Sequence, residues 1–119
     1  VHPVKNIDLQ IQLVHKLNQN NIKTKLHLIG PIRDRIYLNN LSKKINFLKI
    51  KKFINFLGPI YSQKKFEFIT DADICLLTSE FECNSISAIE IMQVGGLLVA
   101  TRNCSLNHAD KFGAIKEKN

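Results

Sequence analysis

Long hydrophobic runs are missing from this 119-residue sequence. No segment approaches the roughly 20 consecutive apolar residues that a membrane-spanning helix requires. The N-terminus also lacks the basic, apolar and small-residue segments of a secretion signal. These two absences favour a cytosolic protein.

Cysteine and histidine are scarce and scattered, which bears on two kinds of site. Three cysteines form an odd set without CxxC spacing, so neither a disulfide framework nor a zinc site is supported. Cys75 lies in an apolar run, which favours a small buried hydrophobic residue. The histidines have no metal-ligand or catalytic-triad spacing. The remaining members of these sets are Cys83, Cys104, His2, His15, His27 and His108.

Acidic residues are few: Asp and Glu number 10 against 17 Lys and Arg, which gives a net charge of +7. Lysine, asparagine and isoleucine are all abundant, which favours a coding bias over selection for an anionic partner. Nucleic acid is not an expected partner, because the lysines lack the interleaved aromatic residues of a single-strand platform. One cluster has two interpretations, a solvated surface or a contact with an anionic membrane. Its members are Lys43, Lys44, Lys49, Lys51 and Lys52.

The apolar residues alternate between two periods along the chain. Helical spacing predicts helices over residues 7–17, 34–48, 63–70 and 85–94, and short apolar runs predict strands over 26–29, 53–57, 74–77 and 97–100. Asn6 is predicted to cap the first helix, and Gly95-Gly96 to end the fourth. After Ala100 the pattern dissolves. The sequence therefore predicts one domain over residues 1–119, truncated at both ends.

Strands separated by helices predict an α/β fold, a Rossmann-like parallel sheet with helices on both faces. In such sheets ligands bind outside the carboxyl ends of the strands. The functional edge is therefore predicted at residues 30–33, 58–62, 78–85 and 101–104.

The segment from Thr78 to Met92 leaves a predicted strand, crosses a polar loop and enters a helix. Asn84 or Ser85 is suited to cap that helix, whose free N–H groups then form a site for phosphate. Glu82 precedes this site and Glu90 lies within the helix. Each carboxylate also has a plain interpretation. Glu82 is then a loop charge, and Glu90 belongs to a water-facing stripe with Ser87 and Gln93.

The spacing of these two glutamates resembles a known signature. Seven residues separate Glu82 from Glu90, as in the E-x7-E motif of retaining GT-B glycosyltransferases, especially family 4. Other landmarks of that family occur here in the same order. They are Pro3 to Leu9 (a lysine segment), Leu28 to Pro31, Phe56 to Gly58, Asp71 to Ile74, Ser79-x-x-Glu82, Glu90-Ile91-Met92, Gly95 and Leu98 to Thr101. The chain thus resembles the C-terminal, donor-binding half of a GT-B fold.

The resemblance implies a role for each matching residue. Glu90 would hold the ribose hydroxyls of a nucleotide diphosphate sugar, and a carboxylate suits two hydroxyl donors. Glu82 would stabilise positive charge on the transferred sugar, and Lys5 would pair with the diphosphate. The other donor-binding residues are main-chain groups of Asn84, Ser85, Ile86 and Ser87, the loop Gly58-Pro59-Ile60 beside the base, and Gly30 at the same edge.

The implied reaction transfers a hexosyl group, with retention, to a glycan or lipid-linked acceptor. The acceptor would be bound by an N-terminal domain that this sequence lacks, so the chain alone is expected to be inactive. No cofactor or metal is expected. Asp71-Ala72-Asp73 imitates the metal motif of the GT-A class, but it precedes a predicted strand and therefore lies at the opposite edge. The alternative is a non-catalytic Rossmann-like module, either a degenerate transferase or a basic nucleic-acid-binding domain.

Overall fold

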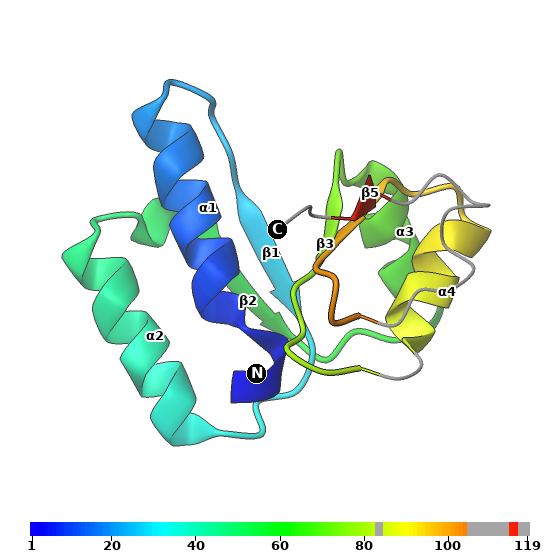
Figure 1. The fold of residues 1–119 in the computed structure, drawn as a ribbon, viewed down its shortest axis with the longest axis horizontal. Helices are drawn as coiled ribbons and strands as arrows, with labels where there is room; N and C mark the ends of the chain where they lie inside the picture. Colours follow the sequence, from blue (N-terminus) through cyan, green and yellow to red (C-terminus); the bar gives the residue numbers. More distant parts are fainter. Residues whose placement is uncertain (83–84, 105–114, 117–119) are drawn as a thin grey trace. The chain divides into compact units, whose positions relative to one another are not determined.

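The computed structural model describes residues 1–82, 85–104 and 115–116. The chain divides into two compact units, Val1–Ile60 and Tyr61–Asn119, and each is described by itself (Figure 1). Among the described residues, no helix is both long and apolar enough to cross a membrane.

The first unit contains a parallel pair of strands joined by a helix. In that pair, β1 and β2 run side by side, with Leu26 opposite Ile54. Helix α1 contacts both α2 and β1 (Figure 1). The predicted β-α-β unit is therefore present. Its elements are η1 (Pro3–Lys5), α1 (Ile7–Gln19), β1 (Leu26–Ile29), α2 (Arg35–Phe47), η2 (Lys51–Phe53) and β2 (Ile54–Gly58).

The core of the first unit follows from helical periodicity. In α1 the buried apolar residues are three or four positions apart, so they share one face of the helix. Helix α2 contributes a similar pair four positions apart. The buried cluster consists of Ile7, Ile11, Val14, Leu41, Ile45, Ile50 and Ile54.

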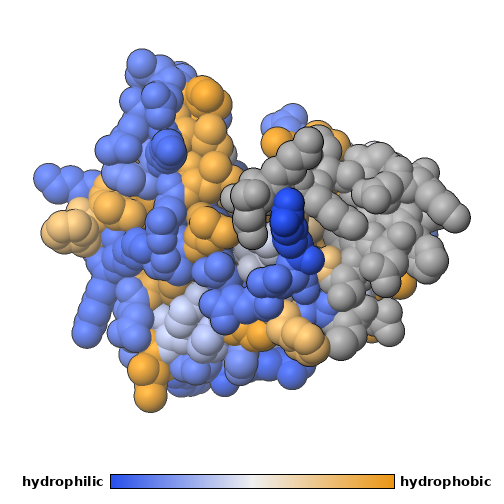
Figure 2. All heavy atoms as spheres, in the orientation of Figure 1, coloured by the Kyte–Doolittle hydropathy of each residue, from blue (hydrophilic) through white to orange (hydrophobic). Residues whose placement is uncertain are grey.

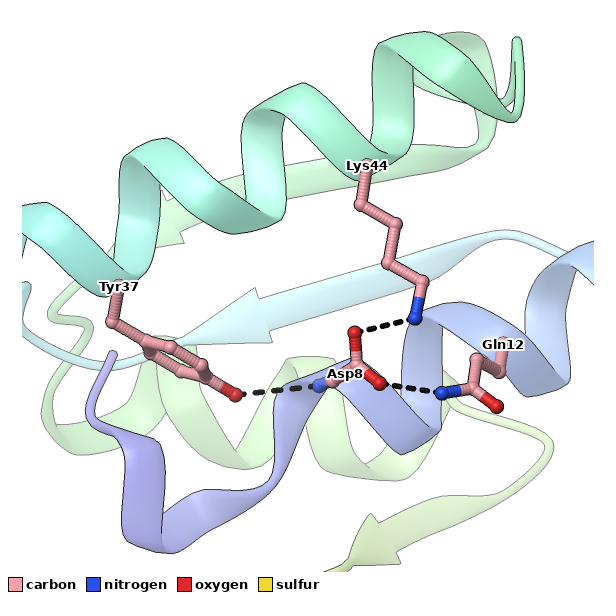
Figure 3. A network of polar contacts seen from close by, with 4 residues as sticks. All are labelled: Asp8, Gln12, Tyr37 and Lys44. Atoms are coloured by element: carbon pink, nitrogen blue, oxygen red, sulfur yellow. Dashed lines mark hydrogen bonds and ion pairs between the residues drawn. The ribbon is translucent and has the colours of Figure 1, made fainter.

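A polar network joins α1 to α2 at the rim of this core (Figure 3). The Lys44 ammonium lies 2.6 Å from Oδ1 of Asp8, and Gln12 donates a hydrogen bond to Oδ2. The backbone N–H of Asp8 donates to the hydroxyl of Tyr37 at 3.4 Å. One member of the predicted lysine cluster is therefore engaged within the fold.

The start of α1 matches the prediction in position but not in hydrogen bonding. Asn6 is the N-cap residue, as predicted, but its side chain makes no capping hydrogen bond. Its φ of 47° places it in the left-handed region, and its N–H donates to the carbonyl of Pro3, the first residue of η1. Asparagine tolerates this conformation better than most residues, so Asn6 forms the bend between η1 and α1.

The second unit contains a three-stranded parallel sheet in the order β3-β4-β5, with two helices. The central strand β4 pairs Leu98 with Cys75 and Val99 with Ile115. Strand β5 was not predicted, because a two-residue strand carries no detectable periodicity. The elements are α3 (Ser62–Asp71), β3 (Cys75–Leu77), α4 (Ile86–Gln93), β4 (Leu98–Ala100) and β5 (Ile115–Lys116).

Helix α4 begins and ends as its sequence predicts. The hydroxyl of Ser85 accepts a hydrogen bond from the N–H of Ala88 at 3.1 Å, which confirms Ser85 as the N-cap. At the other end Gly95 has φ of 73° and donates to Met92, while Gly96 donates to the carbonyl of Ile91 at 2.9 Å. These two bonds form a Schellman motif. Both ends of α4 are therefore fixed by local hydrogen bonds.

The core of the second unit lies between α3, α4 and the sheet. Leu98 at the centre of this cluster is 1% exposed. Its buried members are Ile69, Ala88, Ile91, Leu98, Ala100 and Cys104.

Candidate functional site

The carboxyl ends of β3 and β4 carry two loops that lie together. The N–H of Thr101 donates to the carbonyl of Leu77 at 2.9 Å, and its hydroxyl donates to the carbonyl of Ser79 at 3.1 Å. Further along, the N–H of Glu82 donates to the carbonyl of Asn103 at 3.3 Å. The structure therefore brings together two segments that were predicted at the functional edge, residues 78–82 and 101–104, in the second unit.

Ser79 holds the first glutamate of the motif. Its side chain is 2% exposed, and its hydroxyl donates to Oε2 of Glu82 at 2.8 Å. The sequence identified Ser79 only as a landmark of the resemblance. The structure shows that the Ser-x-x-Glu spacing allows the serine to orient the carboxylate.

Cys104 fills the space beneath these loops. It is 1% exposed, and its sulfur lies 3.6 Å from the carbonyl oxygen of Leu77 and 3.7 Å from the hydroxyl of Thr101. Nothing in the sequence distinguished this cysteine from the others. It supports the loop that carries Glu82 through packing and weak polar contacts.

The start of α4 offers main-chain donors. Because Ser85 takes the N–H of Ala88, the N–H groups of Ile86 and Ser87 remain at the helix end, and no hydrogen bond within the described residues uses them. Both residues are exposed. Such a helix end attracts anions. The predicted site residue Asn84, with Cys83, lies outside the described residues.

Glu90 is paired with a lysine of the neighbouring helix. Its Oε2 lies 2.7 Å from Nζ of Lys65 in α3, with the two side chains 22% and 28% exposed respectively. The water-facing interpretation holds for Ser87 and Gln93, which are exposed, but only in part for Glu90. Its Oε2 atom is buried. This pair was not predicted, because its partners are 25 residues apart on different helices.

The first unit has its own carboxyl edge, formed by the residues that follow β1 and β2. The N–H of Gly30 donates to the carbonyl of Gly58 at 2.9 Å, so the two predicted glycines lie together. Gly58 has φ of 71°, a conformation that favours glycine. Pro59 beyond it is exposed and Ile60 is half-buried.

The N-terminal segment adds positive charge at this edge. The carbonyl of Val1 accepts hydrogen bonds from the N–H groups of Arg33 and Asp34, which follow β1. Partial burial, then the charges of Arg33 and Lys5, lower the pKa of the Val1 amino group. Lys5 is exposed at the end of η1. The predicted phosphate-binding lysine and Arg33 are therefore both close enough to Val1 to affect its amino group.

The Asp-x-Asp segment occupies the place expected of it. Asp71 ends α3 and Asp73 precedes β3, so both lie at the amino edge of the sheet. Within residues 1–82, 85–104 and 115–116, no three His, Cys, Asp or Glu side chains gather in a way that could hold a metal ion.

Burial raises the pKa of the Cys75 thiol, so this group stays protonated at neutral pH.

The fold is the Rossmann-like fold of the GT-B glycosyltransferases. Anabaena HepE in complex with UDP is similar with a TM-score of 0.81 at 18% identity, over 98% of this chain and 32% of that chain. WaaG, a glycosyltransferase involved in lipopolysaccharide biosynthesis, is similar with a TM-score of 0.76 at 20% identity, over 95% of this chain and 30% of that chain.

The family is established by a sequence comparison. The model of the family "glycosyl transferases group 1" matches residues 1–111, and the chain belongs to this family. It spans less than a third of the length of HepE or WaaG. A search among curated protein sequences found no match.

Proposed function

We propose that this chain binds the nucleotide diphosphate sugar of a retaining hexosyltransferase, whose acceptor is a glycan or a lipid-linked sugar. The observation that carries the proposal is the arrangement around the start of α4. Glu82 precedes the helix, the main-chain N–H groups of Ile86 and Ser87 lie in its first turn, and Glu90 lies within it. Family membership supplies the reaction class, and HepE, which is similar in fold, binds UDP and UDP-glucose.

Recognition of the nucleotide is assigned to Glu90 and the helix end. The carboxylate accepts hydrogen bonds from the ribose hydroxyls, because its oxygens have only acceptor capacity when ionised. The N–H groups of Ile86 and Ser87 bind phosphate or sugar oxygens, aided by the positive end of the helix. The family resemblance assigns Gly58 to Ile60 to the base of the nucleotide and counts Gly30 among the donor-binding residues.

The chemical step requires stabilisation of two opposite charges. As the glycosidic bond breaks, positive charge develops at the anomeric carbon and negative charge on the departing diphosphate. Glu82, oriented by Ser79, opposes the first charge. The family resemblance assigns the second charge to Lys5. Neither role requires a metal ion.

A calorimetric titration tests the nucleotide site. We expect the chain to bind at least one of UDP, GDP and ADP. Glu90→Ala should weaken that binding roughly 10- to 150-fold, the loss expected when hydrogen bonds to a charged group are removed. Lys5→Ala should weaken it about 10-fold through loss of a phosphate contact.

Glu80→Ala is the control for Glu90→Ala, because Glu80 is an exposed glutamate that the proposal gives no contact with the nucleotide. It should leave the affinity unchanged. A folded chain that binds none of the three nucleotides, or binds one regardless of Glu90→Ala, contradicts the proposal. Salt-sensitive binding to random oligonucleotides would instead favour the basic, non-catalytic module.

The lysine cluster supports a location at the inner face of an anionic membrane. Phe47, the last residue of α2, is 85% exposed and lies in sequence among four exposed lysines: Lys43, Lys49, Lys51 and Lys52. Hydrophobic residues reach the visible surface among hydrophilic ones (Figure 2). An aromatic side chain surrounded by basic ones suits the interface of an anionic bilayer.

Co-sedimentation with vesicles tests this location. The chain should bind vesicles rich in phosphatidylserine and not vesicles of phosphatidylcholine alone. Phe47→Ser should weaken binding about 5-fold by removing the inserted apolar group. Ile22→Ser, at another exposed apolar residue (54% exposed), should not change it. Equal binding to both kinds of vesicle, or no effect of Phe47→Ser, would count against membrane contact.

A further inference from the structure

The ion pair between Lys65 and Glu90 makes the two oxygens of the Glu90 carboxylate different from each other. Oε2 is buried, and Nζ of Lys65 lies 2.7 Å from it. Within the described residues this contact is an ion pair without hydrogen-bond geometry, and no other group satisfies Oε2. A buried carboxylate oxygen without a counter-charge is strongly disfavoured. Within the described residues, the Lys65 ammonium group is therefore the counter-charge that faces this buried oxygen.

The pair also fixes which part of Glu90 a ligand can reach. With Oε2 buried against Lys65, Oε1 is the oxygen left to accept hydrogen bonds from a bound molecule. A lone glutamate on a helix surface would rotate among several side-chain conformers, and binding would have to order it. An ammonium group held on a neighbouring helix removes much of that freedom before the ligand arrives. A ligand that binds Oε1 would therefore meet a carboxylate that is already held by a residue of α3.

We infer that Lys65 is a positioning residue for ribose recognition: it presents Oε1 of Glu90 to the hydroxyls of the nucleotide. The inference rests on the proposed function, because it requires Glu90 to bind ribose. It assigns Lys65 no contact with the nucleotide, since its ammonium group is directed to Oε2. A purely structural ion pair between α3 and α4 would affect stability without affecting the choice between ribose and deoxyribose.

The test is a ratio of two affinities measured on each variant. The nucleotide is whichever of UDP, GDP and ADP binds the unsubstituted chain, and it is compared with its 2′-deoxy analogue by calorimetry. We expect the unsubstituted chain to prefer the ribonucleotide about 10-fold. Lys65→Met should reduce this preference to less than about 3-fold, and Glu90→Gln should do the same. Lys65→Arg should retain most of it, because an arginine also carries a charge on a long side chain.

Lys64→Met is the matched control, because Lys64 is the adjacent residue of α3 and is exposed. It should leave the preference unchanged. Partial unfolding weakens binding of both nucleotides equally, so the ratio is insensitive to it. If Lys65→Met does not fold, Lys65→Gln replaces it.

Two failures are distinguishable. A preference that survives Lys65→Met but is lost in Glu90→Gln overturns the role of Lys65 and leaves the proposed function standing. Absence of nucleotide binding by the unsubstituted chain overturns the proposed function and, with it, the role of Lys65. A preference that survives in both variants shows that Glu90 does not read the ribose, and it contradicts both.

Discussion

Replacing Leu98 by alanine is expected to lower the free energy of unfolding by about 2–5 kcal/mol. Leu98 is 1% exposed and begins β4, the central strand of the second unit. Its side chain belongs to the same buried cluster as Ile69 and Ile91, from α3 and α4. Truncation would remove apolar contacts and leave a cavity that neighbouring side chains fill only in part. Urea unfolding followed by circular dichroism measures the loss.

The adjacent residue supplies the control for Leu98→Ala. Leu97 has the same side chain but is 41% exposed, so Leu97→Ala should cost less than about 1 kcal/mol. Losses of equal size at the two positions would contradict the burial that the structure assigns to Leu98.

Gly96→Val should destabilise the chain by about 3 kcal/mol, near the upper end of the usual cost of overpacking. A Cβ atom at Gly96 would lie 2.8 Å from Cγ2 of Ile91, 3.2 Å from the carbonyl oxygen of Ile91 and 3.3 Å from Cγ2 of Ile69. Neither isoleucine side chain can readily rotate away from the added atoms, because both are buried in the core and branched at Cβ. Thermal unfolding of the purified variant measures the effect.

Gly95→Ala provides a comparison with a different physical cause. A Cβ at Gly95 meets nothing within 4 Å, but its φ of 73° is strained for other residues. The expected cost is about 1–2 kcal/mol. A Gly96→Val variant as stable as the unsubstituted chain would contradict the close packing of Gly96 against Ile91 at the end of α4.

The features that the sequence predicted correctly are local ones. Ser85 was recognised, with Asn84, as a candidate N-cap and Gly95 as a helix end, because their hydrogen bonds span only three residues along the chain. The helices and the four longer strands were recognised from their periodicity. Asn6 was correctly placed at the start of α1, but its left-handed conformation was not predicted, because asparagine suits both a side-chain cap and a left-handed bend. Strand β5 was missed, because two residues are too few to show a pattern.

In the candidate site, too, contacts between residues close in sequence were predictable and contacts between distant residues were not. Ser79 and Glu82 are three residues apart, so their hydrogen bond was within reach of sequence reasoning once the loop was placed. The partner of Glu90 was not, because Lys65 meets it only when α3 packs against α4. The roles of Lys5, Glu82 and Glu90 toward a nucleotide sugar stay predictions. What the structure adds is the side chains that hold two of these groups in place.

The burial of Cys104 provides a native chemical probe of the edge that carries Glu82. Its sulfur lies beneath the loops after β3 and β4, so a thiol-modifying reagent can reach it only when that edge opens. The rate of its modification, read by mass on the peptide that contains it, would report the frequency of such openings. A ligand that closes the loops over this residue would slow the modification. No label or substitution is needed to follow the site in solution.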